Sequence, residues 1–238
     1  MPDAPQPCDL HLDLVKFKYA LPHLAESLKR QRKIKVVAIG SSSTAGEPSP
    51  NGEVKIVPFP HRLELALRKG AYGRMIDVLN RGICGQEAPE ELSRFESDVI
   101  TEVPALVIWQ VGTNAVYRAV DYNPLEISAA LEAGLDWLAT LPMDVVLMDL
   151  QYTTIIDEKL LDLANKMVAR IAAAADKAQV NVFRRFDLMV QWVKDGVTVA
   201  DMTDPQDTSE LHMSEWATDC VTRSLAGAIA GALPAIAS

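Results

Sequence analysis

The sequence predicts an α/β fold in which a parallel sheet lies between two layers of helices. Short apolar runs rich in β-branched residues alternate with longer segments whose apolar residues recur at helical spacing. Strands that alternate with helices form right-handed βαβ units, which give a parallel sheet covered on both faces. The 238 residues fit one such domain. We therefore expect a three-layer α/β/α sandwich around a flavodoxin-like, five-stranded parallel sheet.

The individual elements follow from the same patterns. The expected strands are apolar runs bounded by glycine or polar residues, at 34–39, 75–79, 105–111, 145–150 and 180–183. The expected helices carry an apolar stripe, near 20–31, 58–70, 89–101, 124–140, 155–178, 187–194 and 214–232. Residues 45–58, rich in glycine and proline, are expected to form a loop of the length that serves a functional site.

The domain organisation is expected to be simple. Residues 1–31 are interpreted as an N-terminal arm and a helix that pack on the domain, and residues 32–238 as that single domain. The sequence contains no internal repeat, low-complexity tract or second-domain boundary.

Composition and charge exclude several classes of function. The formal net charge is −9, and residues 29–35 (KRQRKIK) form the one basic cluster. Non-specific binding of nucleic acid through phosphates is therefore not expected, and the cluster is interpreted as the solvated end of a helix. No apolar run reaches the roughly eighteen residues of a membrane span.

The compartment and the pairing of the cysteines are connected questions. The first residues, MPDAPQPCDL, lack the charged and apolar regions of a signal peptide. They equally suit a mature chain from which a signal has been removed; the protein is then periplasmic or secreted, and otherwise cytoplasmic. In an exported chain Cys8 and Cys220 could pair, and the alternative is isolated buried thiols. Oligomeric state is left open.

Polar clusters follow the expected strands and fall in the last loop. They are GSSST (40–44), NRGICG (80–85), GTN (112–114) and ELH (210–212). Loops at the carboxyl ends of adjacent parallel strands converge, so these segments can form one site. Together they supply a hydroxyl nucleophile, backbone and amide donors and an imidazole base, the parts that acyl transfer needs. Taken singly, each cluster is also what an ordinary helix cap or turn uses.

These clusters, in this order, resemble the four conserved blocks of the SGNH (GDSL-type) hydrolase superfamily. The chain is particularly similar to a bacterial group that reads GSSSTAG, NRG…G, WQVGTN and LHM, and the resemblance runs from about residue 34 to 220. It implies that Ser42 is the nucleophile and His212 the general base. It also implies that the backbone N–H groups of Ser42 and Gly85, with the side-chain amide of Asn114, form the oxyanion hole.

Two positions depart from the family pattern. Ser41 occupies the position of the aspartate that usually precedes the nucleophile. Ser209 occupies the position of the family's acid, three residues before the histidine. The imidazole needs a partner that fixes its tautomer and offsets its charge. The alternatives are, in order of preference, the main-chain carbonyl of Ser209, the carboxylate of Asp207 and that of Glu210.

The expected activity is hydrolysis of a short-acyl ester, acetyl esters of sugars or small alcohols included, through an acyl-enzyme on Ser42. The alternatives are an O-acyltransferase that uses the same site, and a carbohydrate- or ester-binding module of weak or no activity, which the missing acid favours. Gln151 and Tyr117 are expected to contact a small-molecule or carbohydrate ester substrate. No phosphate-binding loop, dinucleotide fingerprint or metal-ligand cluster is present in the sequence, so neither cofactor nor metal is expected.

Overall fold

A five-stranded parallel sheet with the strand order β2-β1-β3-β4-β5 forms the centre of the computed structural model, which describes residues 7–46, 56–70 and 74–234. The strands are β1 (Lys33–Gly40), β2 (Met75–Gly82), β3 (Leu106–Gln110), β4 (Asp144–Met148) and β5 (Asn181–Phe183). This is the flavodoxin-like order. The predicted fold class is therefore confirmed, and all five strands lie where the apolar runs predict them.

The central strands are apolar throughout because helices cover both faces of the sheet. Every residue of β3 and β4 is buried. Strands buried on both faces read as continuous Val/Ile/Leu runs rather than as an alternating pattern. The β1 segment fits this rule from Val36 to Ile39, and its last residue, Gly40, pairs with Gly82 of β2 at the carboxyl edge.

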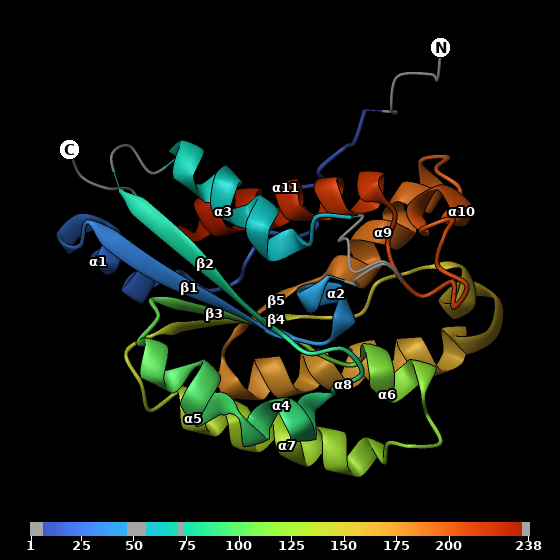
Figure 1. Cartoon of the computed structure of the whole chain (residues 1–238), viewed down its shortest axis with the longest axis horizontal. Helices are drawn as coiled ribbons and strands as arrows, with labels where there is room; N and C mark the ends of the chain where they lie inside the picture. The colour runs from blue at the N-terminus through green and yellow to red at the C-terminus, as the bar shows by residue number, and fades with distance from the viewer. Residues whose placement is uncertain (1–6, 47–55, 71–73, 235–238) are drawn as a thin grey trace.

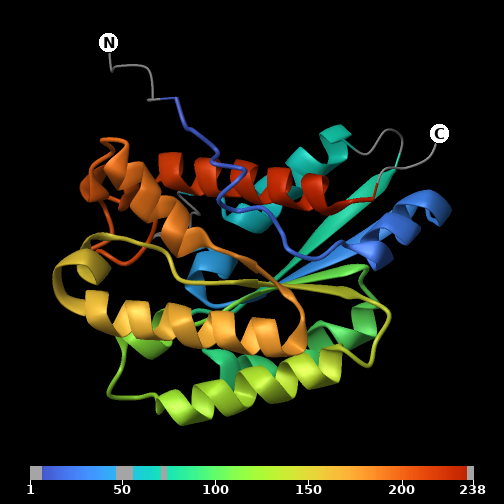
Figure 2. The ribbon, with the colours of Figure 1, turned by 180° about the vertical axis from the view of Figure 1, so that it is seen from behind.

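Seven of the described helices form two layers, one on each side of the sheet (Figures 1 and 2). One layer holds α3 (Phe59–Gly70), α9 (Arg185–Lys194) and α11 (Glu215–Ala232). The other holds α4 (Ala88–Ser93), α5 (Phe95–Asp98), α7 (Pro124–Leu138) and α8 (Leu161–Ala178). The remaining described helices are α1 (Pro22–Arg30), α2 (Ser42–Ala45), α6 (Thr113–Tyr117) and α10 (Val199–Met202).

Two expected helices are interrupted, and the sequence pattern does not predict the short helices α2, α6 and α10. The segment predicted as one helix over 89–101 is α4, α5 and a 3₁₀ turn over Ile100–Glu102. It breaks at Arg94, whose guanidinium donates to the carbonyl oxygens of Arg81 and Gly40. The segment 155–178 begins with a π-helical turn over Ile156–Leu160 before α8. Most of the predicted 45–58 loop, residues 47–55, lies outside the described residues.

The N-terminal arm is bonded to elements from the far end of the chain. The Trp192 indole donates to the Asp9 carbonyl at 2.7 Å, and the Ser224 hydroxyl donates to the Leu10 carbonyl at 3.0 Å. The Tyr19 backbone exchanges two hydrogen bonds with the Asn181 side chain, each 2.9 Å long. The arm thus packs across α9, α11 and β5. The division into 1–31 and 32–238 stays a prediction.

Cys8 and Cys220 lie next to each other as free thiols. A hydrogen bond between the two side chains lowers the pKa of Cys8 and raises that of Cys220. The sequence left open whether Cys8 and Cys220 form a disulfide or are isolated thiols. In this structure both are thiols, and they are in contact with each other.

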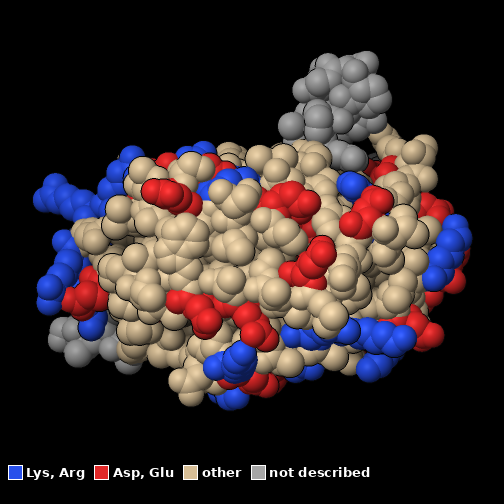
Figure 3. Space-filling view, turned by 90° about the horizontal axis from the view of Figure 1, so that it is seen from below, with Lys and Arg blue, Asp and Glu red and all other residues tan. Residues whose placement is uncertain are grey.

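The surface charge and the length of the helices concern two possible partners, nucleic acid and the membrane. On the face that carries α7, acidic side chains are scattered across the middle and lysines and arginines stand mostly toward the margins (Figure 3). Positive charge is therefore not gathered on this face as phosphate recognition would need. In the part of the chain that the structure describes, no helix is long and apolar enough to cross a bilayer.

Candidate active site

Ser42 lies directly after β1, at the first position of the short helix α2. Its side chain is almost buried, with 8% of the residue exposed. The backbone of α2 packs tightly against β2, because a Cβ atom at Gly82 would lie 2.1 Å from the nitrogen of Ala45. Only glycine permits such a close approach of α2 to β2, and the contact places α2 at the carboxyl edge of the sheet. The strand-then-turn pattern of the sequence thus places the Ser42 hydroxyl at that edge.

Ser42, His212 and Asp207 form a continuous chain of hydrogen bonds. The Nε2 atom of His212 lies 2.9 Å from the Ser42 Oγ, and its Nδ1 atom lies 2.8 Å from the Asp207 Oδ2. When Nδ1 donates its proton to the carboxylate, Nε2 is left to accept from the serine hydroxyl. The side chains of His212 and Asp207 are 14% and 7% exposed. This is the arrangement of a nucleophile, a base and an acid that orients the base.

The partner of the imidazole is the carboxylate of Asp207, not the main-chain carbonyl of Ser209 that the sequence ranks first. The reason is the turn over 207–212. Asp207 accepts the backbone N–H groups of Ser209, Leu211 and His212, at 2.8 to 2.9 Å, together with the Ser209 hydroxyl. Glu210 adopts a left-handed conformation, with φ +54°. The longer turn therefore wraps around the Asp207 side chain and delivers it to His212.

Hydrogen bonds keep Asp207 ionised although it is largely buried. Burial alone would raise the pKa of this carboxyl group. The hydroxyl and backbone N–H of Ser209, the backbone N–H of His212 and the nearby imidazole more than offset burial, and the pKa is lowered well below its usual range. A permanently charged carboxylate is what an imidazolium at His212 needs beside it.

Gly85 lies on the loop after β2 and Asn114 lies in α6, and these two segments are bonded to each other. The Asn114 Nδ2 donates to the carbonyl of Gln86 at 2.8 Å, which uses one of its two protons. Gly85 has φ +78°, a conformation that glycine adopts without strain, and its carbonyl accepts from the Tyr122 hydroxyl at 3.0 Å. The structure thus joins the second and third predicted blocks. The roles of these two residues as oxyanion donors stay a proposal.

A buried carboxylate, Glu87, positions the helix that carries Asn114. Its Oε1 accepts from the Gly112 N–H at 2.8 Å, and its Oε2 accepts from the Ala115 N–H at 2.9 Å. Burial raises its pKa despite these backbone donors. Glu87 also closes a capping box with Glu90 at the start of α4. Local sequence could reveal the capping box, but not the bonds to α6.

A row of buried polar side chains links the loop before Ser42 to the loop before His212. The Gln110 Oε1 accepts the backbone N–H and the hydroxyl of Ser41, both at 3.1 Å, and its Nε2 donates to the Thr113 hydroxyl. That hydroxyl in turn donates to the Gln151 Oε1 at 3.1 Å, and the Gln151 Nε2 donates to the Leu211 carbonyl at 3.1 Å. Ser41, found in place of the usual aspartate, is therefore the first member of this row.

The expectation that Gln151 contacts substrate is not met. The residue is 1% exposed and both ends of its amide are bonded within the row, so it supports the His212 loop from beneath. Tyr117, the other expected substrate contact, is half-buried at the end of α6 and remains a candidate. Among the described residues, no group of three or more His, Cys, Asp or Glu side chains is arranged to hold a metal ion.

The buried guanidinium of Arg185 holds Ser43, the residue next to Ser42, in α2. It donates to the Ser43 hydroxyl at 3.3 Å and twice to the Asp149 carbonyl. The carboxyl group of Asp149 accepts the Phe186 N–H at 2.9 Å. Burial raises the pKa of Asp149 to about 7 and lowers that of Arg185 to about 10. Arg185 escaped the sequence analysis because only the fold brings it to α2.

Comparisons with known proteins agree with this architecture. Residues 7–234 match the Non-GDSL lipase-like family. Among curated proteins none matches the sequence significantly. Solved structures that match include Axe2, an acetylxylan esterase from Geobacillus stearothermophilus, at 17% identity and a TM-score of 0.69 over 82% of this chain and 94% of that one. LAE5, an α/β hydrolase enzyme from the metagenome of Lake Arreo, Spain, matches at 16% identity and a TM-score of 0.70, over 83% and 95%. At these identities the likeness shows the shared fold.

Proposed function

The chain belongs to the Non-GDSL lipase-like family, within the SGNH-type hydrolases, and from that premise we propose that it is a serine esterase that cleaves short-acyl esters at Ser42. The observation that carries this proposal is the unbroken contact from Asp207 through His212 to the Ser42 hydroxyl. Each of the three groups has the partner that its role requires.

The reaction follows from these contacts. As the Ser42 Oγ attacks the ester carbonyl carbon, its proton passes to the Nε2 of His212, and the charge of Asp207 stabilises the resulting imidazolium. The carbonyl oxygen becomes an oxyanion, for which the N–H groups of Ser42 and Gly85 and the free proton of the Asn114 amide are the donors. The intermediate then expels the alcohol, which takes the proton from Nε2. Water then attacks the acyl-enzyme in the same way: it gives a proton to His212, the carboxylic acid leaves, and the Ser42 hydroxyl takes the proton back.

Two features support a short acyl group. The connection from α6 to α7 contains Arg118, Asp121 and Asn123, so its described residues form no long apolar lid. The fold is also shared with an acetylxylan esterase, whose solved structures include catalytic variants with a serine, an aspartate or a histidine replaced by alanine. Acetyl esters of sugars are therefore the first substrates to test.

The binding-module alternative has lost the feature that favoured it. That alternative was based on the missing acid at position 209. Asp207 fills the role instead, at 2.8 Å from the imidazole. A protein that only binds an ester has no need for an ionised carboxylate behind a histidine that faces a serine.

The test is hydrolysis of p-nitrophenyl esters from acetate to palmitate, and of acetylated xylo-oligosaccharides, by the wild type and two matched variants. Ser42→Ala is expected to abolish turnover. Ser43→Ala, which removes the neighbouring hydroxyl bonded to Arg185, is expected to keep most of it. Rates that peak at the short esters and vanish only in Ser42→Ala support the proposal. Equal rates in the wild type and Ser42→Ala, or a maximum at palmitate, contradict it.

A further inference from the structure

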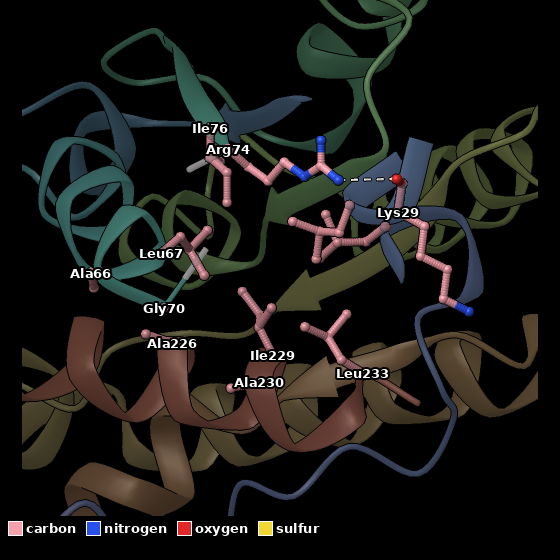
Figure 4. Close-up of a pocket in the computed structure, with 12 residues that line it drawn as sticks. Lys29, Ala66, Leu67, Gly70, Arg74, Ile76, Ala226, Ile229, Ala230 and Leu233 are labelled. Atoms are coloured by element: carbon pink, nitrogen blue, oxygen red, sulfur yellow. Dashed lines mark hydrogen bonds between the residues drawn. The ribbon is translucent and has the colours of Figure 1, made fainter. Parts of the chain in front are cut away.

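A cavity of about 440 Å³ lies at the amino end of the sheet, where α1, α3, β2 and the end of α11 meet. Its walls are aliphatic and are formed mainly by Leu24, Leu28, Leu67, Ile76, Ile229 and Leu233 (Figure 4). The volume falls in the range of about 300–1,000 Å³ that small-molecule sites occupy. A predominantly aliphatic lining favours a hydrocarbon chain.

The cavity is separate from the Ser42 site. Ser42 follows the carboxyl end of β1, whereas the cavity contacts Ile76 near the start of the neighbouring parallel strand β2. Along α11, Ile229 lies about 21 Å beyond the first residue, Glu215, at a rise of 1.5 Å per residue. In Figure 1 the two sites are at opposite ends of the sheet, with α2 at one and the start of β2 at the other.

Small residues keep the cavity open. Ala226 and Ala230 face it from α11, and Ala66 and Gly70 face it from α3. These side chains carry at most one methyl group, so two helices that would otherwise interlock leave space between them. A large side chain at Ala226, which is half-buried, would occupy that space.

Two cations stand at the rim of this apolar space. Arg74 donates from Nη2 to the Lys29 carbonyl at 3.1 Å (Figure 4), and among the described residues its other N–H groups have no hydrogen-bond acceptor. Lys29 is exposed, and its side chain extends away from the Arg74 guanidinium (Figure 4). Within residues 7–46, 56–70 and 74–234, neither is paired with a carboxylate. Arg30, by contrast, is already neutralised by Glu26.

This juxtaposition selects an anion with an aliphatic tail. One of the two rim cations, Lys29, begins the basic segment 29–35, which stands out in a chain of net charge −9. We propose that the cavity binds a single aliphatic carboxylate, a medium-chain fatty-acid anion, with its tail among the leucines and isoleucines and its carboxylate at Arg74. The site lies between four elements and its volume suits one chain, which favours a monomeric ligand over a bilayer surface. It does not depend on the proposed esterase activity.

The test is calorimetric titration of the Ser42→Ala protein with decanoate below its micellar concentration. We expect saturable binding at one site with a negative heat-capacity change, the mark of apolar burial. Ala226→Phe should weaken binding at least tenfold, whereas Ala133→Phe, on the exposed face of α7, should leave it unchanged. Arg74→Gln should weaken decanoate binding several-fold and leave decanol binding unchanged, because it removes the charge and keeps the aliphatic lining residues.

Three outcomes would overturn the proposal. The first is the absence of saturable binding to the wild-type cavity. The second is full binding to a folded Ala226→Phe protein, whose folding is checked by its thermal unfolding. The third is binding only to phosphatidylglycerol vesicles and not to free decanoate, which would make this end of the molecule a membrane-docking surface.

Discussion

Asp207 and Asp149 both lie at the carboxyl edge of the sheet and both are largely buried, but their pKa values move in opposite directions. The Asp207 carboxylate accepts three backbone N–H groups and the Ser209 hydroxyl and also contacts the imidazole, and its pKa is lowered. The Asp149 carboxyl group accepts the N–H of Phe186, and its pKa is raised to about 7. Nearby Arg185 gives its closest bonds to the Asp149 carbonyl rather than to the carboxylate.

The contrast shows that hydrogen-bond donors, more than burial, determine which carboxylate can serve as the acid of the site. Desolvation is the largest influence on both groups. Only the turn over 207–212 supplies enough donors to overcome it. The same comparison indicates which residues to change.

The largest effect is expected at Asp207 itself. Asp207→Asn should lower kcat about 10³- to 10⁴-fold, because an amide cannot fix the tautomer or offset the charge of His212. Asp149→Asn is the matched control and should keep kcat within a few-fold of wild type. Steady-state kinetics on p-nitrophenyl acetate measures both. If Asp207→Asn keeps more than a tenth of the activity, another group orients the base.

The next effect is expected beneath the turn, where Gln151 holds the Leu211 carbonyl. Gln151→Leu leaves the Thr113 hydroxyl without its acceptor, and the Leu211 carbonyl keeps only the Thr153 hydroxyl as a side-chain donor. We expect kcat to fall roughly tenfold to a hundredfold as His212 loses its position, with little change in KM. Unfolding should become easier by about 1–3 kcal/mol. A rise in KM with kcat unchanged would instead restore Gln151 as a substrate contact.

A third experiment tests the raised pKa of Asp149 through the pH dependence of the free energy of unfolding. The raised pKa means that folded Asp149 keeps its proton up to about pH 7, while the unfolded group loses it near pH 4. The stabilisation is therefore complete below about pH 4 and is lost as the pH rises to about 7, on the order of 4 kcal/mol in all. Urea unfolding across this range should show that decline. Asp149→Asn should flatten it, and an unchanged slope in the variant would refute the assignment.

The smallest effect is expected from Ser209→Ala. The variant removes the hydroxyl that bonds to both oxygens of Asp207 but leaves the three backbone donors in place. The carboxylate should remain ionised at neutral pH, so activity at pH 8 should fall less than about fivefold. A loss as large as that of Asp207→Asn would show that the hydroxyl, not the backbone, holds the turn.

Strand periodicity and glycine turns are local signals, and they predict the sheet and the polar clusters that follow its strands. The resemblance to the SGNH hydrolases then selects Ser42, Gly85, Asn114 and His212 from these clusters. Asp207 was among the predicted partners of His212 but ranked second. Its selection depends on the left-handed Glu210 and on how the turn closes, neither of which has a clear local signature.

The residues that the sequence could not reveal share a different property. Gln110, Glu87 and Arg185 act on segments far along the chain, and each is joined to its partner only by the fold. Gln151 was expected to contact substrate because it follows β4. A side chain at that position can also point into the protein interior, as that of Gln151 does. Position at a strand end therefore does not distinguish a substrate contact from a buried support.

The bonds of the N-terminal arm set the order in which the protein can be completed as it is made. Leu10 accepts from Ser224, 214 positions later, Asp9 accepts from Trp192, and the Leu21 N–H donates to the Ala232 carbonyl. Residues 9–21 must therefore wait until residues 192–232 have been made before these bonds can form. Until then the arm and the surface that receives it stay open to solvent and to chaperones.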